Sequence, residues 1–243
     1  MKERVTIING NNPIILVCPH GPDDTNTSII TKVCAKEVDC SAIINNGWKR
    51  TKNINESSGR ANCNSATQVL NSRNSVLFSE YGAPLLRMVA DSLVSNSNSM
   101  VFHIHGVGDH ISINQPFPIG FVMGFGQSKK KPSHTCPLWL KNSFAEYVNY
   151  DVHRGYAAAQ GRKGGNYCAR RKDNMAQHLK LTYENSNYTL HNLQLEINYE
   201  LREDKSIAEE TGKYLAGFLK MVLNSNLQST GHVMPNFHKV PVV

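Results

Sequence analysis

Residues 13–45 read PIILVCPHGPDDTNTSIITKVCAKEVDCSAIIN, and this stretch decides the fold class. Its first six residues, 13–18, form a continuous apolar run that Pro19 ends, which is typical of a strand buried on both faces of a parallel sheet. Apolar side chains then recur at helical spacing over 27–38, and a second apolar run follows at 41–45. Strand, helix and strand in this order predict a β-α-β unit and hence a parallel sheet.

The rest of the chain continues this alternation. Strands are expected at 100–106, 118–126 and 191–201, and helices at 80–96, 135–148 and 205–225. Together with the opening unit they predict an α/β fold with a mostly parallel central sheet flanked by helices.

Two segments carry no clear periodicity. Residues 46–75 are rich in Asn, Ser, Lys and Gly and predict a long functional loop, and the Gly-rich stretch 155–171 is expected to be irregular. Neither a repeat nor a linker divides the chain. We therefore expect one domain over residues 1–243, ending in a loosely structured tail at 226–243.

The charge balance is basic, with 26 Lys and Arg against 19 Asp and Glu and a formal net charge of +7. Such a chain could bind nucleic acid or a small anion. Aromatic residues are not interleaved with the one dense run, Lys129–Lys131, although base stacking would require them. We expect a small anionic ligand rather than nucleic acid, and no membrane partner, since no stretch approaches about 18 apolar residues. The oligomeric state is left open.

The six Cys residues lie at positions 18, 34, 40, 63, 136 and 168 and form no CxxC pair. Several lie within apolar runs, so they are expected to be reduced, buried thiols of an intracellular protein. The start of the chain has a charged tip but no apolar segment of signal length. These features predict a cytoplasmic location.

Polar residues directly after the first apolar strand are the first candidates for chemistry. His20, Asp23 and Asp24 follow its end, and ligands of open α/β sheets bind at the carboxyl ends of strands. Imidazole nitrogen and carboxylate oxygen are both zinc ligands. The alternative is a turn in which an Asp caps the following helix. These residues alone leave both interpretations open.

A pair of histidines lies in VFHIHG, residues 101–106. Residues two apart in a strand share a face, so His103 and His105 point the same way. His105 lies nearer the strand end and is the better candidate metal ligand. His103 would orient a ligand or provide a fourth group. The alternative is a pair of hydrogen-bonded core histidines.

A carboxylate lies in NLQLEIN, residues 192–198, where three apolar residues alternate with Gln194, Glu196 and Asn198. In a central strand, Glu196 would lie in a cleft, where a carboxylate can act as a general base. In an exposed edge strand, the polar face would simply be solvated. The spacing alone does not separate these readings.

Zinc-dependent hydrolysis would combine the three features. Three protein ligands leave one zinc position open for water, whose pKa then falls to about 7. A nearby carboxylate takes the proton and returns it to the leaving amine. His20, one of Asp23 and Asp24, His105 and Glu196 supply these groups. The chain contains no GxSxG elbow or Walker loop, and GFVMGFG lacks the spacing of a dinucleotide fingerprint.

These motifs resemble the N-formylglutamate amidohydrolase family, which is related to the poly-gamma-glutamate hydrolases and, more distantly, to the zinc carboxypeptidases. PHG after an apolar strand, an acid before NTS, then HIHG and LQLEIN occur in the family's order over residues 13–201. The resemblance implies a zinc-exopeptidase or phosphorylase/hydrolase-like α/β fold with a mixed sheet. It also implies one zinc ion bound by His20, an acid and His105, with Glu196 as general base.

The acidic ligand differs between the related families. The carboxypeptidase spacing His-x-x-Glu points to Asp23, whereas the poly-gamma-glutamate hydrolase pattern, aligned on Thr27 and Ser28, points to Asp24. We favour Asp24 and keep Asp23 as the alternative. Either Asp replaces the Glu of some relatives, and this shorter side chain requires a closer approach of the backbone.

The substrate contacts depart from the family pattern. GRANCNS falls where relatives carry Asp-x-Asn-Arg, and Asn62 and Asn64 fit this frame, but Ser65 replaces the Arg. Another guanidinium would then have to hold a substrate carboxylate, which Arg does with two parallel hydrogen bonds. The candidate substrate-binding residues are Arg170, Arg162, Arg50, Asn64 and His103, and among the arginines we favour Arg170.

The sequence thus predicts a metal-dependent hydrolase of amide C–N bonds that acts on a small N-acyl amino acid, such as N-formylglutamate, or on a gamma-glutamyl substrate or short peptide. Two alternatives stay open. One is a zinc carboxypeptidase-like peptidase, and the other is a non-catalytic module that binds polyanions on the same fold.

Overall fold

The computed structural model describes residues 3–70, 73–108, 119–126, 135–151, 157–160, 167, 169, 171–185 and 187–225. In this part of the chain, seven strands form one sheet: β1 (Val5–Ile8), β2 (Asn12–Cys18), β3 (Cys40–Asn45), β4 (Asn98–Val107), β5 (Ile119–Gly124), β6 (Ala157–Gln160) and β7 (Thr189–Asn198). The helices are α1 (Thr27–Val38), α2 (Ala66–Leu70), the π-helix η1 (Phe78–Gly82), α3 (Ala83–Asn96), α4 (Leu138–Asp151), α5 (Met175–Tyr183), the 3₁₀ helix η3 (Tyr199–Leu201) and α6 (Lys205–Asn224).

The sheet is mixed, with the strand order β1-β3-β2-β4-β7-β5-β6. Strands β3, β2, β4 and β7 are parallel neighbours and form its middle. β1 is antiparallel to β3, and β5 is antiparallel to β7 but parallel to β6. The predicted β-α-β unit is β2-α1-β3, and the predicted mixed, mostly parallel sheet flanked by helices is confirmed.

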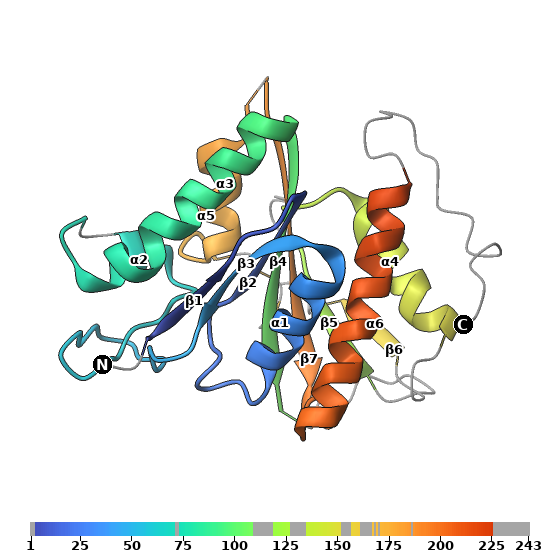
Figure 1. Ribbon diagram of the computed structural model, residues 1–243, viewed down its shortest axis with the longest axis horizontal. Helices are drawn as coiled ribbons and strands as arrows, with labels where there is room; N and C mark the ends of the chain where they lie inside the picture. The colour runs from blue at the N-terminus through green and yellow to red at the C-terminus, as the bar shows by residue number, and fades with distance from the viewer. Residues whose placement is uncertain are drawn as a thin grey trace.

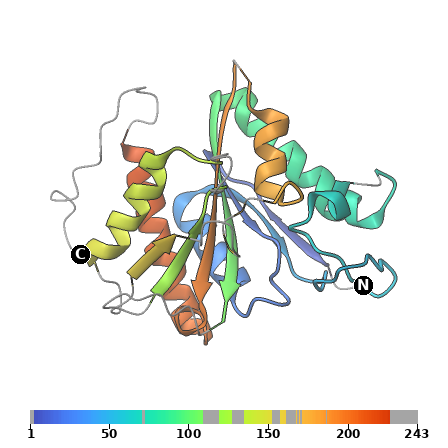
Figure 2. The ribbon, with the colours of Figure 1, turned by 180° about the vertical axis from the view of Figure 1, so that it is seen from behind.

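Helices cover both faces of the sheet. Figures 1 and 2 show α1, α4 and α6 on one side and α2, α3 and α5 on the other. Successive residues of β2 alternate between the two cores. Ile14, Leu16 and Cys18 pack with α1, α4 and α6, whereas Ile15 and Val17 pack with α2, α3 and α5. Burial on both faces is the reason why β2 is apolar without interruption.

The register of β4 and β7 decides which polar residues meet. His103 pairs with Gln194, and His105 pairs with Glu196. Both strands run in the same direction as β2, so their carboxyl ends lie at one edge of the sheet together with the end of β2 at Cys18. The predicted convergence of three strand ends is therefore observed.

Several elements differ from the expectation. The stretch 155–171, expected to be irregular, contains β6, and the long loop expected at 46–75 contains α2. The strand expected at 191–201 ends at Asn198, and η3 forms its last three residues. β1 and α5 carry no pattern that predicted them. All of these elements except α5 are five residues long or shorter, and tertiary pairing rather than local periodicity specifies them.

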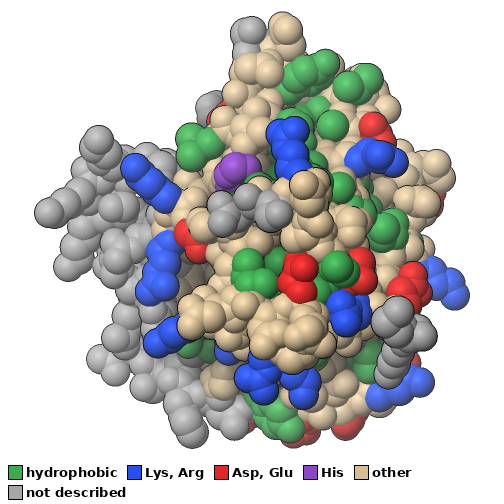
Figure 3. All heavy atoms as spheres, turned by 90° about the vertical axis from the view of Figure 1, so that its left-hand side faces the viewer, with side chains coloured by type: hydrophobic (Ala, Val, Ile, Leu, Met, Phe, Trp, Pro, Cys, Tyr) green, Lys and Arg blue, Asp and Glu red, His purple; other side chains and the backbone are tan. Residues whose placement is uncertain are grey.

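The remaining sequence expectations concern the thiols, the surface and possible membrane spans. The five cysteines within the described segments are buried and free, as expected for reduced thiols. No helix in the same segments is long and apolar enough to cross a membrane. On the face that Figure 3 shows, cationic and anionic side chains are interspersed. Cys168, Lys129–Lys131 and the tail 226–243 lie outside the described residues, and the one-domain organisation stays a prediction.

Helix α6 should contribute strongly to stability through its buried face. Leu219 is 3% exposed in the core, whereas Leu181, on α5, is 76% exposed. We expect Leu219→Ala to lower the free energy of unfolding by about 2–5 kcal/mol, and Leu181→Ala to change it by less than about 0.5 kcal/mol. Urea unfolding followed by circular dichroism measures both. Equal losses in the two variants would contradict the packing of α6.

Candidate metal centre

The turn after β2 places His20 and Asp24 at the end of that strand. The backbone N–H of Asp24 donates to the His20 carbonyl oxygen at 2.7 Å, and the Thr27 hydroxyl donates to the Asp24 carbonyl oxygen at 2.7 Å. These bonds fold the chain back on itself before α1 begins. His20 is 3% exposed and Asp24 is 6% exposed, so both side chains face the protein interior.

Neither acid of this turn caps α1. The N-cap position is Asn26, in the left-handed region at φ 59°, and its side chain makes no capping bond. Asp23 is exposed and accepts a hydrogen bond from the backbone N–H of Arg50 at 2.7 Å. Asp24 instead accepts from the backbone N–H of Gly106 at 3.0 Å. Asp24 therefore faces the end of β4, and Asp23 anchors the loop after β3.

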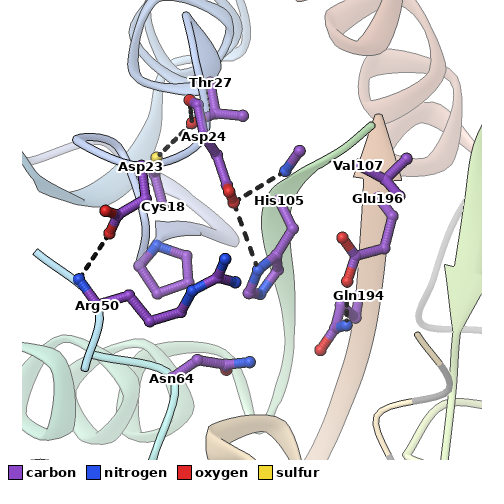
Figure 4. Close-up of polar contacts among 12 residues, drawn as sticks. Cys18, Asp23, Asp24, Thr27, Arg50, Asn64, His105, Val107, Gln194 and Glu196 are labelled. Atoms are coloured by element: carbon purple, nitrogen blue, oxygen red, sulfur yellow. Dashed lines mark hydrogen bonds and ion pairs between the residues drawn. The ribbon is translucent and has the colours of Figure 1, made fainter. Parts of the chain in front are cut away.

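His20, Asp24 and His105 lie together at the carboxyl edge of the sheet. The ring centroids of His20 and His105 are 5.1 Å apart. Nδ1 of His105 lies 3.9 Å from Oδ2 of Asp24. Figure 4 shows Asp24 reaching down toward His105, with Glu196 on the neighbouring strand.

Burial determines the charge state of these groups. Burial lowers the pKa of His20 to about 3, with a further contribution from the positive charge of Arg50. Burial also holds the pKa of His105 well below its usual value and raises the pKa of Asp24. Neutral imidazole is the form that binds a metal ion, and a cation would offset the burial of a carboxylate.

The donor set fits a zinc ion by its chemistry. Nδ1 of His20 and Nε2 of His105 are buried and have no hydrogen-bond partner among the described residues, which is uncommon for buried polar atoms. Two imidazoles and one carboxylate are typical of catalytic zinc sites. As the side chains stand, no three His, Cys, Asp or Glu residues in the described segments are close enough together to hold an ion. Metal binding would therefore draw these side chains toward one another.

Glu196 lies in a central strand rather than at an edge. β7 is paired with β4 on one side and with β5 on the other, and Glu196 is 5% exposed. Its Oε1 accepts a hydrogen bond from Nε2 of Gln194 at 2.6 Å. Burial raises the pKa of Glu196 to about 8, and the nearby carboxylate of Asp24 adds to this effect. The solvated-edge interpretation of this strand is wrong.

His103 is fully buried and shares a hydrogen bond of 3.2 Å with Oδ1 of Asn192 through its Nε2. Burial lowers its pKa to about 4. It lies two residues before His105, farther from the strand end. This contact matches the alternative of a hydrogen-bonded core histidine, and a role in substrate binding stays a prediction.

Arg50 is the candidate arginine that the structure brings to this site. Figure 4 shows its guanidinium pointing toward His105, while the backbone of Arg50 is held by Asp23. Its charge contributes to the lowered pKa of both His20 and His105. The side chain is exposed, so a ligand from solvent can reach it.

The loop that carries Asn64 forms the floor of the site. Asn64 lies beneath Arg50, and its Oδ1 is buried with no hydrogen-bond partner in the part of the chain that the structure describes. Ser65, at the position where the family resemblance implies an arginine, donates its hydroxyl to Oδ2 of Asp173 at 2.7 Å. Ser65 thus ties this loop to the segment before α5. Arg162 and Arg170 lie outside the described residues.

Arg202 supports the site, and no pattern in the sequence predicted this role. It is 5% exposed, and its guanidinium donates to the carbonyl oxygens of Ile197 at 3.1 Å, Thr25 at 2.9 Å and Val107 at 2.9 Å. These bonds join the ends of β4 and β7 to the turn after β2. A Cβ on Gly106 would lie 2.5 Å from Cζ of Arg202, so a larger residue at this position would displace the guanidinium.

Comparison with solved structures shows the fold. A gene product from Agrobacterium tumefaciens superposes with a TM-score of 0.56 at 10% identity, covering 92% of this chain and 96% of its own. An N-formylglutamate amidohydrolase from Ralstonia eutropha superposes with a TM-score of 0.58 at 15% identity, covering 92% and 98%. A bacteriophage poly-gamma-glutamate hydrolase gives a lower TM-score of 0.46 at 15% identity, covering 90% and 92%.

No protein-family model and no curated protein sequence matches the chain significantly. The chain therefore shares its fold, over nearly its whole length, with the Agrobacterium tumefaciens gene product and the Ralstonia eutropha N-formylglutamate amidohydrolase. At 10–15% identity this similarity concerns the fold alone.

Proposed function

We propose that this chain is a zinc-dependent amidohydrolase that cleaves the amide bond of a small anionic N-acyl amino acid, such as N-formylglutamate, or of a gamma-glutamyl substrate. The observation that carries the proposal is the pairing of His105 with Glu196 at adjacent strand ends, with His20 and Asp24 facing them. The fold shared with an amidohydrolase supports this reaction class.

The proposed zinc ligands are His20, Asp24 and His105. When bound there, zinc would act as a Lewis acid that lowers the pKa of a water molecule and polarises the amide carbonyl. Burial keeps both imidazoles neutral and therefore ready to donate a lone pair. The hydrogen bond from Gly106 orients the Asp24 carboxylate. Asp23, which holds the Arg50 loop, is not part of the proposed set.

Glu196 is the proposed general base and acid. The positive charge of a bound zinc ion would favour the ionised form of this buried carboxylate. The carboxylate then takes a proton from the attacking water and returns that proton to the amine that leaves. Its position beside His105 brings the carboxylate next to the proposed metal site without making it a ligand. Its burial excludes bulk water, which strengthens electrostatic interactions around the reacting groups.

Arg50 and Asn64 are the proposed substrate contacts. The guanidinium of Arg50 is exposed and points toward His105, so it can hold a carboxylate of the substrate. The amide oxygen of Asn64, which no described residue contacts by a hydrogen bond, can accept a bond from a donor on the same substrate. The exposed positive charge of Arg50 beside the proposed metal site favours an acidic substrate, such as one with a glutamyl group.

The first experiment is metal analysis by mass spectrometry on protein purified without chelator, followed by a substrate panel. We expect about one zinc per chain and hydrolysis of N-formylglutamate, another N-acyl amino acid or poly-gamma-glutamate. If the protein hydrolysed none of these substrates but released the C-terminal residue of unmodified peptides, it would have a carboxypeptidase-like activity instead. A protein that turns over none of these substrates, but binds DNA or RNA in 200 mM salt when metal-free, would support the polyanion-binding alternative.

Loss of the Arg50 guanidinium should weaken substrate binding more than turnover. We expect Arg50→Met to raise KM for the best substrate of the panel by about 10-fold or more, because hydrogen bonds to charged groups are worth about 1.5–3 kcal/mol. Steady-state kinetics measures KM and kcat separately. The matched control is Arg87→Met, since Arg87 is exposed on α3. An unchanged KM in Arg50→Met would remove Arg50 from the substrate contacts.

A further inference from the structure

A chain of side-chain amides connects the start of α5 with Glu196. Oδ1 of Asn174 accepts a hydrogen bond from the backbone N–H of Ala176 at 2.9 Å and thereby caps α5. Nδ2 of Asn174 donates to Oε1 of Gln194 at 3.0 Å. Nε2 of Gln194 then donates to Oε1 of Glu196 at 2.6 Å. Each of these three bonds uses a different atom of the amides.

The direction of this chain is determined at its first bond. A backbone N–H can only donate, so the amide oxygen of Asn174 must face Ala176 and its NH₂ must face Gln194. The oxygen of Gln194 is then turned toward Asn174, and its NH₂ is turned toward Glu196. The cap of α5 therefore determines that the NH₂ group of Gln194, and not its oxygen, faces Glu196.

The chain of amides is shielded from solvent where it reaches the Glu196 carboxylate. Gln194 is 4% exposed and Glu196 is 5% exposed, so bulk water cannot substitute for the amide. A donated hydrogen bond on Oε1 also fixes the plane of the carboxylate and hence the place of its second oxygen. This restraint is what a general base needs in order to meet a water molecule at one defined position.

Asn174, where the chain of amides begins, lies in a segment that is bound to the Asn64 loop. The segment before α5 is bound to the Asn64 loop, since N–H of Met175 donates to the Asn64 carbonyl oxygen at 3.0 Å and N–H of Ala66 donates to the Asp173 carbonyl oxygen at 2.8 Å. Oδ1 of Asp173 accepts from N–H of Thr67 at 2.7 Å. The loop with a proposed substrate contact and the residue that starts the amide chain thus form one unit.

We propose that Gln194 and Asn174 are positioning residues, which hold the Glu196 carboxylate in the orientation required for proton transfer through the two consecutive amide hydrogen bonds. This inference rests on the proposed function, because it assigns the restraint to the general base of that reaction. Neither amide belongs to the proposed zinc ligands or substrate contacts, so both residues act through Glu196.

The test is Asn174→Asp, which separates the cap from the chain. Aspartate caps helices as well as asparagine does, so the bond from Ala176 is retained. It has no NH₂, however, so Gln194 will turn its own NH₂ toward the new carboxylate and present its oxygen to Glu196. We expect kcat to fall by about 10–100-fold, with KM within about 3-fold and the melting temperature unchanged.

Two further variants test whether the residues act as one chain. Gln194→Met removes the donor to Glu196 with little change of volume and should lower kcat to a similar extent. Adding Asn174→Asp to Gln194→Met should then lower kcat no further, because the bond that Asn174→Asp disrupts is already absent. The matched control is Asn185→Asp, since Oδ1 of Asn185 also accepts a backbone N–H bond, from Asn187, but lies beyond the other end of α5.

A second measurement does not depend on turnover. Side-chain amide NMR should show one Gln194 NH₂ proton shifted downfield by its bond to Glu196, and Asn174→Asp should change the chemical shift of this signal, because the bond moves to the new carboxylate. An unchanged signal would overturn the direction of the chain, and an unchanged kcat in an active enzyme would overturn the positioning role while leaving the proposed function intact. A parent protein that binds zinc but hydrolyses no substrate, with the NMR signal present, would refute the proposed function and the positioning role with it, while leaving the amide chain as a structural feature.

Discussion

Replacement of Glu196 by Gln will lower kcat by about 10²–10⁴-fold and leave zinc bound. Glutamine has nearly the same shape as glutamate, so the packing around this buried position is preserved, but its amide cannot accept the proton of the attacking water. Glu196 is not among the proposed zinc ligands, and the metal content should therefore stay at about one ion per chain. Steady-state hydrolysis and mass spectrometry of the same preparation measure both quantities.

The matched control for this variant is Glu203→Gln, because Glu203 is exposed and lies beyond the end of β7. It should retain the parental kcat and the parental zinc content. If Glu196→Gln hydrolysed its substrate at the parental rate, Glu196 would not be the general base. If the variant lost both turnover and zinc, Glu196 would belong to the ligand set, and the division of roles proposed above would be wrong.

The strand-helix-strand unit at residues 13–45 could be predicted because its signals are local. β2 is apolar without interruption since it is buried on both faces, and α1 shows its buried face by spacing alone. The elements that were missed lack such a signal. β6 reads AAAQ and acquires its strand conformation by pairing with β5, and β1 is a four-residue strand that pairs with β3 at the edge of the described sheet.

The residues of the candidate site could be predicted by type and by position at strand ends, but not by their partners. His105 and Glu196 are adjacent because β4 and β7 pair in one register, and no local pattern specifies a register between distant strands. Asp23 and Asp24 are equivalent by spacing. They are separated only by their contacts with N–H of Arg50 and N–H of Gly106, which belong to two different segments.

Arg202 is a residue of the candidate site that the sequence could not predict. Arginine is almost never fully buried unless its charge is compensated, so an isolated arginine after a strand predicts a surface residue. In this protein three backbone carbonyls at the ends of the central strands accept its donors, and these carbonyls are brought together only by the folded sheet. The same holds for Asn174 and Gln194, whose hydrogen bond joins α5 to β7.

Replacement of His105 by Ala is expected to remove zinc from the protein. His105 is one of two imidazoles in the proposed ligand set, and no described residue bonds to its buried Nε2. Loss of an outer partner of a metal ligand already costs 10–100-fold in affinity, so loss of a ligand should weaken binding by at least about 100-fold. Zinc content after dialysis and a zinc titration of the metal-free protein measure the effect, and circular dichroism checks that the variant is folded.

The two neighbouring acids provide the sharpest control for this metal site. Asp24→Asn should lose zinc as His105→Ala does, because Asp24 is the buried acid that faces His105. Asp23→Asn should keep zinc, since Asp23 is exposed and contacts the backbone of Arg50 instead. Zinc retained at about one ion per chain in His105→Ala would remove His105 from the ligand set. Zinc lost in Asp23→Asn but kept in Asp24→Asn would reverse the assignment of the acidic ligand, because only the acid bound to the metal is needed to hold it.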